Sequence, residues 1–222
     1  MGMGVQSRRV TPNPRSDLEG LVVAGGFSTR FGEADKAVAE LAGTPMIRRV
    51  VDRLAEVTDR VVVNCRSDQE SAIREAVSGC EPEVRFAFDP VPDRGPVAGI
   101  HTGLELVDRE FAAAVACDMP FVDPELLELL HERAREEGAD AAVVELEDGW
   151  IQTTQAVYRS ETMARACDET LRSEDKRILA AIDRLERVTV EESALEAEGI
   201  DLETFESVDT REALRAAEER LE

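Results

Sequence analysis

The chain lacks the long apolar runs and the paired cysteines that mark several large classes of protein. No hydrophobic stretch approaches the roughly 20 apolar residues of a membrane-spanning helix, so no membrane partner is expected. The four cysteines, Cys65, Cys80, Cys117 and Cys167, are far apart and form no Cys-x-x-Cys pair. This spacing argues against a zinc site or a disulfide framework. We expect small, buried, apolar cysteines and a cytoplasmic location.

Lysine is almost missing, whereas acidic residues are in large excess. The 222 residues carry 26 basic and 48 acidic side chains, a formal net charge of −22, and the lysines are Lys36 and Lys176. Such an excess repels nucleic-acid backbones, so no nucleic-acid partner is expected. It also keeps a protein soluble where salt screens self-repulsion, which predicts a halophilic source. On a surface that avoids lysine, Lys36 is a candidate for a role that needs a compact ammonium charge.

Apolar runs and amphipathic stretches alternate from residue 20 onwards, after a leader (1–17) that we expect to be flexible. Buried strands that alternate with helices predict an α/β fold with helices on both faces of a parallel sheet. The predicted strands cover 20–24, 60–65, 83–88, 111–117 and 139–146, and the predicted helices cover 45–57, 68–79, 95–107 and 123–138.

Polar and glycine-rich features follow the first four predicted strands. Gly25 and Gly26 follow the first strand, Asn64 lies at the end of the second, Asp89 follows the third and Asp118 follows the fourth. Ligands of parallel sheets bind beyond the carboxyl ends of the strands. We therefore expect these groups to share one cleft.

The stretch LVVAGGFSTRFGEADKAV (21–38) takes an apolar strand into a cationic, glycine-rich loop. Gly25 and Gly26 let the backbone approach a ligand closely. Exposed amides there, together with Ser28, can cradle phosphate oxygens, and Arg30 and Lys36 add positive charge. The pattern predicts a phosphate-binding loop.

Two familiar phosphate-binding patterns do not fit this loop. The dinucleotide fingerprint needs G-x-G-x-x-G, but the glycines here are adjacent. The Walker loop needs Gly-Lys-Ser/Thr, but Glu33 follows Gly32. An NAD-dependent oxidoreductase is disfavoured, also because Asn64 stands where such a protein needs an acidic residue.

Three polar residues at strand ends have candidate ligand roles. Asp118 is a candidate Mg²⁺ ligand, because Mg²⁺ prefers a few carboxylate oxygens plus substrate phosphates; the alternative, capping the next helix, suits Asp123 better. Asn64 offers a donor and an acceptor to a base edge or a ribose, or else is a turn amide. Asp89, before Pro90, is a ligand contact or a turn former.

The two histidines have no partner motif. We expect His101 to be structural and His131 to face solvent on its helix.

Residues 21–38 resemble the opening signature of the nucleotidyltransferases that include molybdenum cofactor guanylyltransferase. That family shows Leu-Ala-Gly-Gly-x-Ser-x-Arg-Met-Gly and then Asp-Lys; here Val23 and Phe31 replace the Leu and the Met, and Asp35-Lys36 match. Later family motifs are resembled, in order, by GPVAGI (95–100), CDMPFV (117–122) and FESVDTREAL (205–214).

The resemblance implies a Rossmann-like three-layer α/β/α sandwich with a mostly parallel, mixed sheet of the nucleotide-diphospho-sugar transferase type. It implies a single domain over 18–222, with a nucleotide-binding half (18–122) and an acceptor-binding half (123–222). It also implies a GTP site, with Mg²⁺ on Asp118, built from Val23, Ala24, Gly25, Lys36, Asn64, Asp89 and Asp118, to which the loop argument adds Gly26 and Ser28.

Two departures from the family pattern concern the acceptor half. Ser207 and Asp209 correspond to the family's paired asparagines, and an Asp-Thr pair there is like that of cytidylyl-transferring relatives. Thr153 stands where a proline is expected after Gln152, although 148–159 are still expected to form strands near the acceptor. Asp209 is a candidate second metal ligand.

The activity that the resemblance implies is Mg²⁺-dependent transfer of GMP from GTP to molybdopterin, a step of molybdenum cofactor biosynthesis, with release of pyrophosphate. Arg30, Lys36 and Asp118 are the candidate catalytic residues. Guanylyl transfer to adenosylcobinamide phosphate, cytidylyl transfer to molybdopterin and a nucleotide-binding regulator without turnover stay open as alternatives. Expected partners are GTP and a phosphate-bearing acceptor, with molybdoenzymes or their chaperones receiving the product; we expect a monomer or a weak oligomer.

Overall fold

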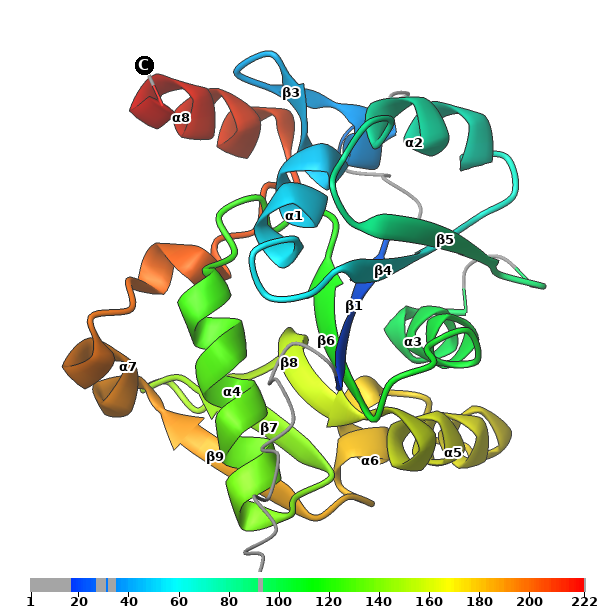
Figure 1. The fold of residues 1–222 in the computed structure, drawn as a ribbon, viewed down its shortest axis with the longest axis vertical. Coiled ribbons are helices and arrows are strands. Elements are labelled where there is room, and N and C mark those ends of the chain that lie inside the picture. The colour runs from blue at the N-terminus through cyan, green and yellow to red at the C-terminus, as the bar shows by residue number, and fades with distance from the viewer. Residues whose placement is uncertain (1–16, 27–30, 32–34, 92–93, 222) are drawn as a thin grey trace, which may run out of the picture.

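A computed structural model describes residues 17–26, 31, 35–91 and 94–221 of the chain (Figure 1). The strands are β1 (Leu18–Val23), β2 (Glu40–Leu41), β3 (Thr44–Pro45), β4 (Arg60–Cys65), β5 (Glu83–Phe88), β6 (Phe111–Ala116), β7 (Ala141–Glu145), β8 (Ile151–Arg159) and β9 (Arg187–Glu191). The helices are α1 (Met46–Leu54), α2 (Glu70–Ala76), α3 (Pro96–Leu104), α4 (Pro124–Glu137), α5 (Ser160–Arg172), α6 (Ile178–Ile182), α7 (Glu192–Glu198) and α8 (Arg211–Leu221), with short 3-10 helices η2 (Lys36–Val38) and η3 (Leu202–Phe205).

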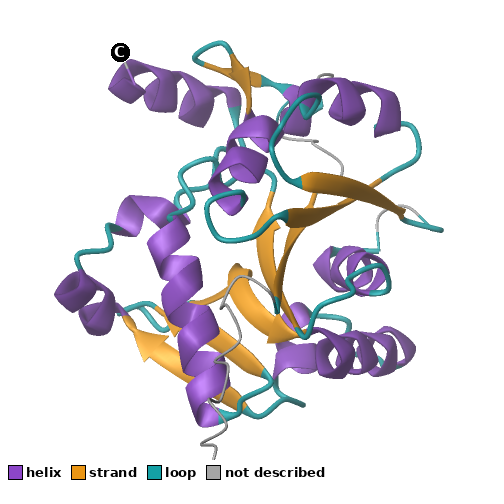
Figure 2. Ribbon diagram, viewed as in Figure 1, coloured by secondary structure: helices purple, strands orange, loops and turns teal. Residues whose placement is uncertain are grey.

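A seven-stranded sheet of order β5-β4-β1-β6-β8-β7-β9 forms the middle layer (Figure 2). Strands β5, β4, β1 and β6 are parallel neighbours, so their carboxyl ends meet at one edge; Val23, for example, lies opposite both Asn64 and Ala116. Strand β8 is antiparallel to β6 and β7, and β9 is parallel to β7. The α/β fold with a mostly parallel, mixed sheet is therefore confirmed.

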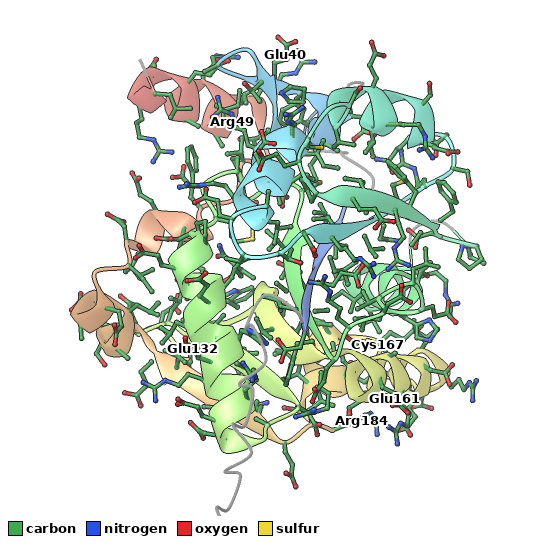
Figure 3. The ribbon with its side chains drawn as sticks, in the orientation of Figure 1. Glu40, Arg49, Glu132, Glu161, Cys167 and Arg184 are labelled. Carbon is green, nitrogen blue, oxygen red and sulfur yellow. The ribbon has the colours of Figure 1, made fainter. Side chains whose placement is uncertain are left out.

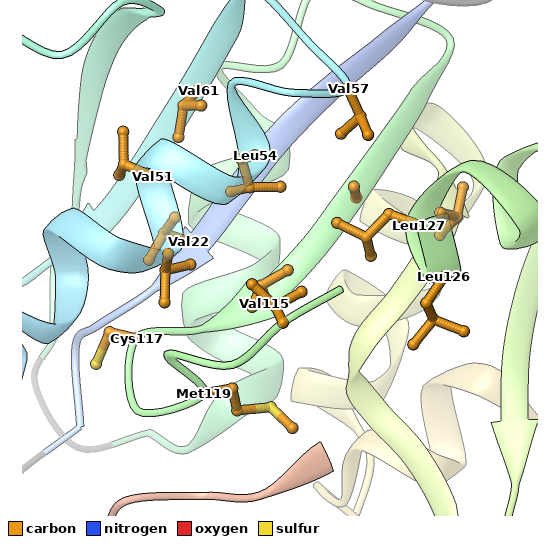
Figure 4. Close-up of a cluster of buried hydrophobic side chains, with 14 of the residues drawn as sticks. Val22, Val51, Leu54, Val57, Val61, Val115, Cys117, Met119, Leu126 and Leu127 are labelled. Carbon is orange, nitrogen blue, oxygen red and sulfur yellow. The ribbon is translucent and has the colours of Figure 1, made fainter. Parts of the chain in front are cut away.

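Alternating strand residues supply two separate apolar cores, one on each face of the sheet. On β4, Val61 and Val63 pack into the core beneath α1 and α4, whereas Val62 packs into the core beneath α3, α5 and α6. Figure 4 shows the first core, in which Leu54 of α1 and Leu127 of α4 lie over the sheet. Strands buried on both faces explain the continuous valine and alanine runs in the sequence.

The predicted boundaries hold better for strands than for helices. Strands β4 and β5 match the predicted 60–65 and 83–88, but the helices predicted at 45–57 and 95–107 end at Leu54 and Leu104. Past each end, turn bonds keep an apolar residue at helical spacing: Val57 N donates to Leu54 O at 3.0 Å and Val107 N to Leu104 O at 3.2 Å. Periodicity alone cannot separate such a turn from the helix.

The expectation that His131 faces solvent is wrong. Only 2% of His131 is exposed, because it lies one turn beyond Leu127 on the buried face of α4. Its ring packs edge-on against Phe111, with ring centroids 5.2 Å apart, and its Nε2 lies 3.3 Å from Asp17 Oδ1.

The expectation of buried cysteines is confirmed for three of the four residues. All four are free thiols, and Cys80 alone among them is half-buried rather than buried.

Charged side chains extend from the outer surfaces of the helices, among them Glu132 on α4 and Glu161 on α5, both exposed (Figure 3). Within the described residues no helix is both long and apolar enough to cross a membrane. Helix α4, with 14 residues, is about 21 Å long, well short of the ~30 Å hydrocarbon core of a bilayer.

Candidate active site

A cavity of about 420 Å³ lies at the carboxyl ends of β1, β4, β5 and β6. It is lined by every candidate nucleotide-binding residue that the structure describes: Val23, Ala24, Gly25, Gly26, Lys36, Asn64, Asp89 and Asp118. Ser28 and Arg30 lie outside the described residues. The groups expected at four separate strand ends thus do share one cleft.

Asn64 and Asp89 form one wall of this cavity. Asn64 Nδ2 donates to Asp89 Oδ1 at 2.7 Å and to the Ala87 carbonyl at 3.4 Å. Asn64 is fully buried, and its Oδ1 has no hydrogen-bond partner among the described residues. An orphaned buried acceptor costs about 1–3 kcal/mol, which a ligand donor can recover. Burial raises the pKa of Asp89 above its usual 3.8, while hydrogen bonds from Asn64 and Thr102 oppose that rise.

Two glycines leave the space that this wall needs. A Cβ at Gly25 would lie 2.1 Å from Asp89 Oδ2 and 3.2 Å from Asn64 Oδ1. A Cβ at Gly99 would lie 2.5 Å from Asn64 Oδ1 and 3.1 Å from Val23 Cγ1. Since real Cβ atoms essentially never approach other atoms this closely, a side chain at either position would push Asn64 or Asp89 out of place.

An ion pair between Lys36 and Asp118 forms the floor of the cavity. Lys36 begins η2, and its Nζ donates to Asp118 Oδ2 just beyond the end of β6. Burial lowers the pKa of Lys36, but Cys117, Asp118 and Asp209 raise it, and the net shift is upward from 10.5. Burial also raises the pKa of the Cys117 thiol, so that group is neutral at physiological pH. The two carboxylates therefore keep Lys36 charged.

The C-terminal segment brings Asp209 to this floor. Val208 N donates to the carbonyl of Asp118 at 2.8 Å, which fixes residues 207–209 beside the end of β6. Ser207 lines the cavity, and the charge of Asp209 acts on Lys36. The two carboxylates thus come from segments that are far apart in the sequence.

Gln69 supports the floor of the cavity without lining it, a role that sequence reasoning missed. Its Nε2 donates to the Ala24 carbonyl at 3.2 Å and to Asp35 Oδ2 at 2.5 Å. Asp35 in turn caps η2 by accepting from Ala37 N at 3.1 Å. Gln69 therefore ties the end of β1 to the short helix that presents Lys36. The adjacent Asp35-Lys36 pair was the only sequence signal for this network.

Arg66 supports the glycine loop, and was also missed. Its Nη1 donates to the carbonyls of Gly26 at 3.0 Å and Gly25 at 3.4 Å, while its Nε donates to Asp68 at 3.1 Å. Only 9% of Arg66 is exposed. Arg66 therefore fixes the described start of the loop by binding the carbonyls of both glycines.

The opposite wall comes mostly from the later part of the chain and holds residues to which the sequence assigned no role. Trp150 and Thr154 of the β7–β8 region lie there with Gln152, Met119 and Phe205. Arg94, at the start of the α3 loop, is the second cation of the described lining, after Lys36. Thr153 is not among the lining residues, and its backbone carbonyl accepts from the Tyr158 hydroxyl at 2.7 Å.

The donor set suits a magnesium ion that is shared with a substrate. Among the described residues no cluster of three or more His, Cys, Asp or Glu side chains could hold a metal. Mg²⁺ does not need such a cage, because it is bound by one or two carboxylates together with substrate phosphates and water. Asp118 on the cavity floor, with Asp209 nearby, fits that requirement.

The fold is α/β with a mixed sheet, and the edge where the parallel strands end carries a glycine loop, a lysine–aspartate pair and a buried asparagine. These features are those of a nucleotide-binding protein of the transferase type. Residues 20–188 match the MobA-like NTP transferase domain, and the chain belongs to this family.

Relatives of known name agree with this assignment. A probable molybdenum cofactor guanylyltransferase of Natronomonas pharaonis is 50% identical over 202 residues, which cover 91% of this chain and 97% of that one. A molybdenum cofactor guanylyltransferase of Desulfosudis oleivorans is 31% identical over 90% of this chain and 94% of its own.

Solved structures show the same architecture. Molybdopterin-guanine dinucleotide biosynthesis protein A from Archaeoglobus fulgidus superposes with a TM-score of 0.74 and 25% identity, over 92% of this chain and 98% of that one. A 4-diphosphocytidyl-2C-methyl-D-erythritol synthase from Anaerococcus prevotii has a TM-score of 0.68 at 15% identity, over 92% and 97% of the two chains. The second likeness is one of fold alone.

Proposed function

We propose that this chain is a Mg²⁺-dependent guanylyltransferase that transfers GMP from GTP to molybdopterin and releases pyrophosphate. The observation that carries the chemistry is the Lys36–Asp118 pair on the floor of a cavity that has a glycine loop beside it. The choice of GTP and molybdopterin follows the names of the relatives. In this proposal residues 18–122 bind the nucleotide and residues 123–222 bind the acceptor.

The acceptor's own phosphate is the proposed nucleophile. A phosphate monoester loses its second proton near pH 6, so at neutral pH its oxygen can attack the α-phosphorus without a general base. The cavity agrees with this, since neither His101 nor His131 lines it. What remains for the protein is in-line positioning and neutralisation of charge.

Lys36 and Asp118 are the proposed catalytic residues, with Arg30 of the glycine loop as a third. Asp118 would hold Mg²⁺, with Asp209 as a second ligand; the bound ion supplies charge neutralisation across the phosphates. Lys36 would then turn its ammonium from Asp118 to the oxygens of the departing pyrophosphate.

Asn64 and Asp89 are the proposed contacts to the guanosine, through the orphaned Asn64 Oδ1 and the Asp89 carboxylate. Both can accept hydrogen bonds from ring N–H, amino or ribose hydroxyl donors. The backbone at Val23, Ala24, Gly25 and Gly26, with Ser28, would hold the phosphates.

Removing either member of the floor pair tests the proposal. Lys36→Ala and Asp118→Ala should each lower turnover by roughly 10²–10³, the usual cost of one lost transition-state contact. Lys176→Ala is the matched control, because it removes the other lysine of the chain from an exposed position outside the cavity. Unfolding curves establish that all three variants fold. Near-normal turnover in either floor variant would refute these roles.

Nucleotide selectivity separates the proposal from its nearest alternative. Cytidylyl transfer is favoured by one feature, the Asp209-Thr210 pair, in which Asp209 stands where the family has an asparagine. GTP, CTP, ATP and UTP are titrated with Mg²⁺ in molar KCl, first with the wild type and then with Asp209→Ala. Selective GTP binding supports the guanylyltransferase and leaves molybdopterin and adenosylcobinamide phosphate as acceptors to compare. Selective CTP binding replaces it with a cytidylyltransferase, and binding of none would end the enzyme proposal.

A further inference from the structure

Trp150 stands out as a large apolar side chain that the proposed chemistry leaves unused. It is the single tryptophan of the chain, 66% of it is exposed, and it lies on the rim of the cavity. Among the described residues no ring or guanidinium stacks on its indole, and its indole N–H has no protein acceptor. An indole held at a cavity mouth without a partner offers a flat face to a ligand.

The backbone holds Trp150 in this position. Strands β7 and β8 are joined by a tight turn in which Gly149 has φ 81° and its N–H donates to the Leu146 carbonyl at 2.8 Å. Trp150 N donates to Asp148 Oδ1 at 2.9 Å, and the Trp150 carbonyl accepts from Leu146 N at 2.9 Å. The turn is also tied to α7, since Glu147 N donates to Glu192 Oε2 at 2.9 Å. The indole is therefore presented by a fixed hairpin.

The order of the strands separates Trp150 from the nucleotide wall. Asn64 ends β4, whereas Trp150 directly precedes β8, and β1 and β6 lie between those two strands. Three strand spacings put about 14 Å between the two sides of the site. Asp118, at the end of β6, lies between them. A ligand on Trp150 is thus on the far side of the reacting phosphates from a base held by Asn64.

We propose that Trp150 is a stacking platform for the planar nitrogen heterocycle of the acceptor, a pterin ring on the proposed function, on which this inference rests. The wall beside it supplies both polar and apolar surface, with Gln152 and Thr154 from β8 and Phe205 from η3. Stacking on the indole leaves the polar edge of the ring to these neighbours. The acceptor's phosphate then reaches toward Asp118, where the transfer takes place.

The test measures ring binding and nucleotide binding separately on the full chain. The probe is 6-hydroxymethylpterin, which carries the ring without a phosphate, titrated with and without GTP against wild type, Trp150→Ala and Trp150→Phe. Leu106→Ala is the matched control, since Leu106 is another exposed apolar residue but lies outside the cavity. Calorimetry gives both affinities, and unfolding midpoints report on the fold.

We expect Trp150→Ala to bind the pterin roughly 5- to 150-fold more weakly, the range for loss of one aromatic stack. GTP affinity and the unfolding midpoint should not change, and Trp150→Phe should recover most of the pterin affinity. Loss of GTP binding instead of pterin binding would place the indole under the base and overturn the inference. Equal pterin affinity in wild type and Trp150→Ala, or no pterin binding by a wild type that binds GTP, would overturn it too. Failure of the wild type to bind any nucleotide would instead count against the proposed function.

Discussion

One methyl group at Gly25 should damage the proposed nucleotide site, whereas the same methyl group at Gly26 should not. A Cβ at Gly25 would lie 2.1 Å from Asp89 Oδ2, but a Cβ at Gly26 would meet no atom of the described residues within 4 Å. Neither glycine has a positive φ, so alanine is compatible with both backbones. The two neighbouring substitutions therefore differ in one respect, the room around the added carbon.

The size of the effect follows from how Asp89 is held. A carbon–oxygen contact needs about 3.3 Å, so the carboxylate must move by roughly 1 Å. That movement breaks the 2.7 Å bond from Asn64 Nδ2 to Asp89 Oδ1. A hydrogen bond to a charged group contributes about 1.5–3 kcal/mol. Because Asp89 is half-buried and can swing toward solvent, we expect a loss of about 1–3 kcal/mol in unfolding free energy.

The assay is a GTP titration by calorimetry, with urea unfolding of the same samples. Gly25→Ala should bind GTP at least 10-fold more weakly, since it displaces a proposed guanosine contact worth 1.4 kcal/mol or more. Gly26→Ala should stay close to wild type, and its stability should rise slightly because alanine restricts the unfolded chain. If the two variants behave alike, the close approach at Gly25 is not what the site requires, and the assignment of Asp89 fails with it.

Two further predictions concern groups away from the ligand. Gln69→Ala removes the bonds to Ala24 and Asp35 and should lower the unfolding free energy by about 1–2 kcal/mol while weakening GTP binding, measured in the same two assays; unchanged GTP affinity would show that the network does not position the loop. Burial lowers the pKa of His131 below its usual 6.5, although Asp17 opposes this, so the unfolded chain takes up the proton first. The contribution of neutral His131 to the unfolding free energy should be fully present above pH 6.5 and be lost as the pH falls below it. Urea unfolding at pH 7.5 and 5.5 measures this loss, which should be smaller in His131→Leu.

The fold could be predicted from the sequence because its strands are unusually plain. The centre of β4 in the run RVVVNC is three consecutive valines, which are apolar and β-branched, so the strand could be located. Strand β8 is different: it contains Gln152 and Gln155 as buried polar residues. Gln155 Nε2 donates to Thr204 Oγ1 at 2.7 Å, 49 residues away, while its Oε1 has no hydrogen-bond partner among the described residues. A pairing of that kind depends on tertiary structure, which no local pattern encodes.

The candidate site could be predicted where its residues directly follow strands, and not where they act from other segments. Residues that follow a strand directly, such as Asn64 and Asp118, are placed by the strand itself, so the topology brings them together. Gln69 and Arg66 act through backbone carbonyls of another segment, and in the sequence they look like any polar residues at the start of a helix. His131 was misjudged because a histidine among charged residues on a helix looks solvated, while its buried partner Phe111 lies on a distant strand.

In the proposed enzyme, the order of the strands separates the residues that set the rate from those that choose the substrate. On the proposed function, the reacting phosphates lie over β1 and β6, in the middle of the sheet edge, with the nucleotide over β4 and β5 and the acceptor over β8. The middle is well anchored, since both strands are buried on both faces and the backbone that carries Lys36 is held by the Asp35 cap of η2. The acceptor side is a hairpin and a C-terminal segment, which can change without disturbing the parallel strands. Substitutions at Trp150 or Ser207 should therefore alter which acceptor is used, whereas substitutions at Lys36 should lower turnover with every acceptor.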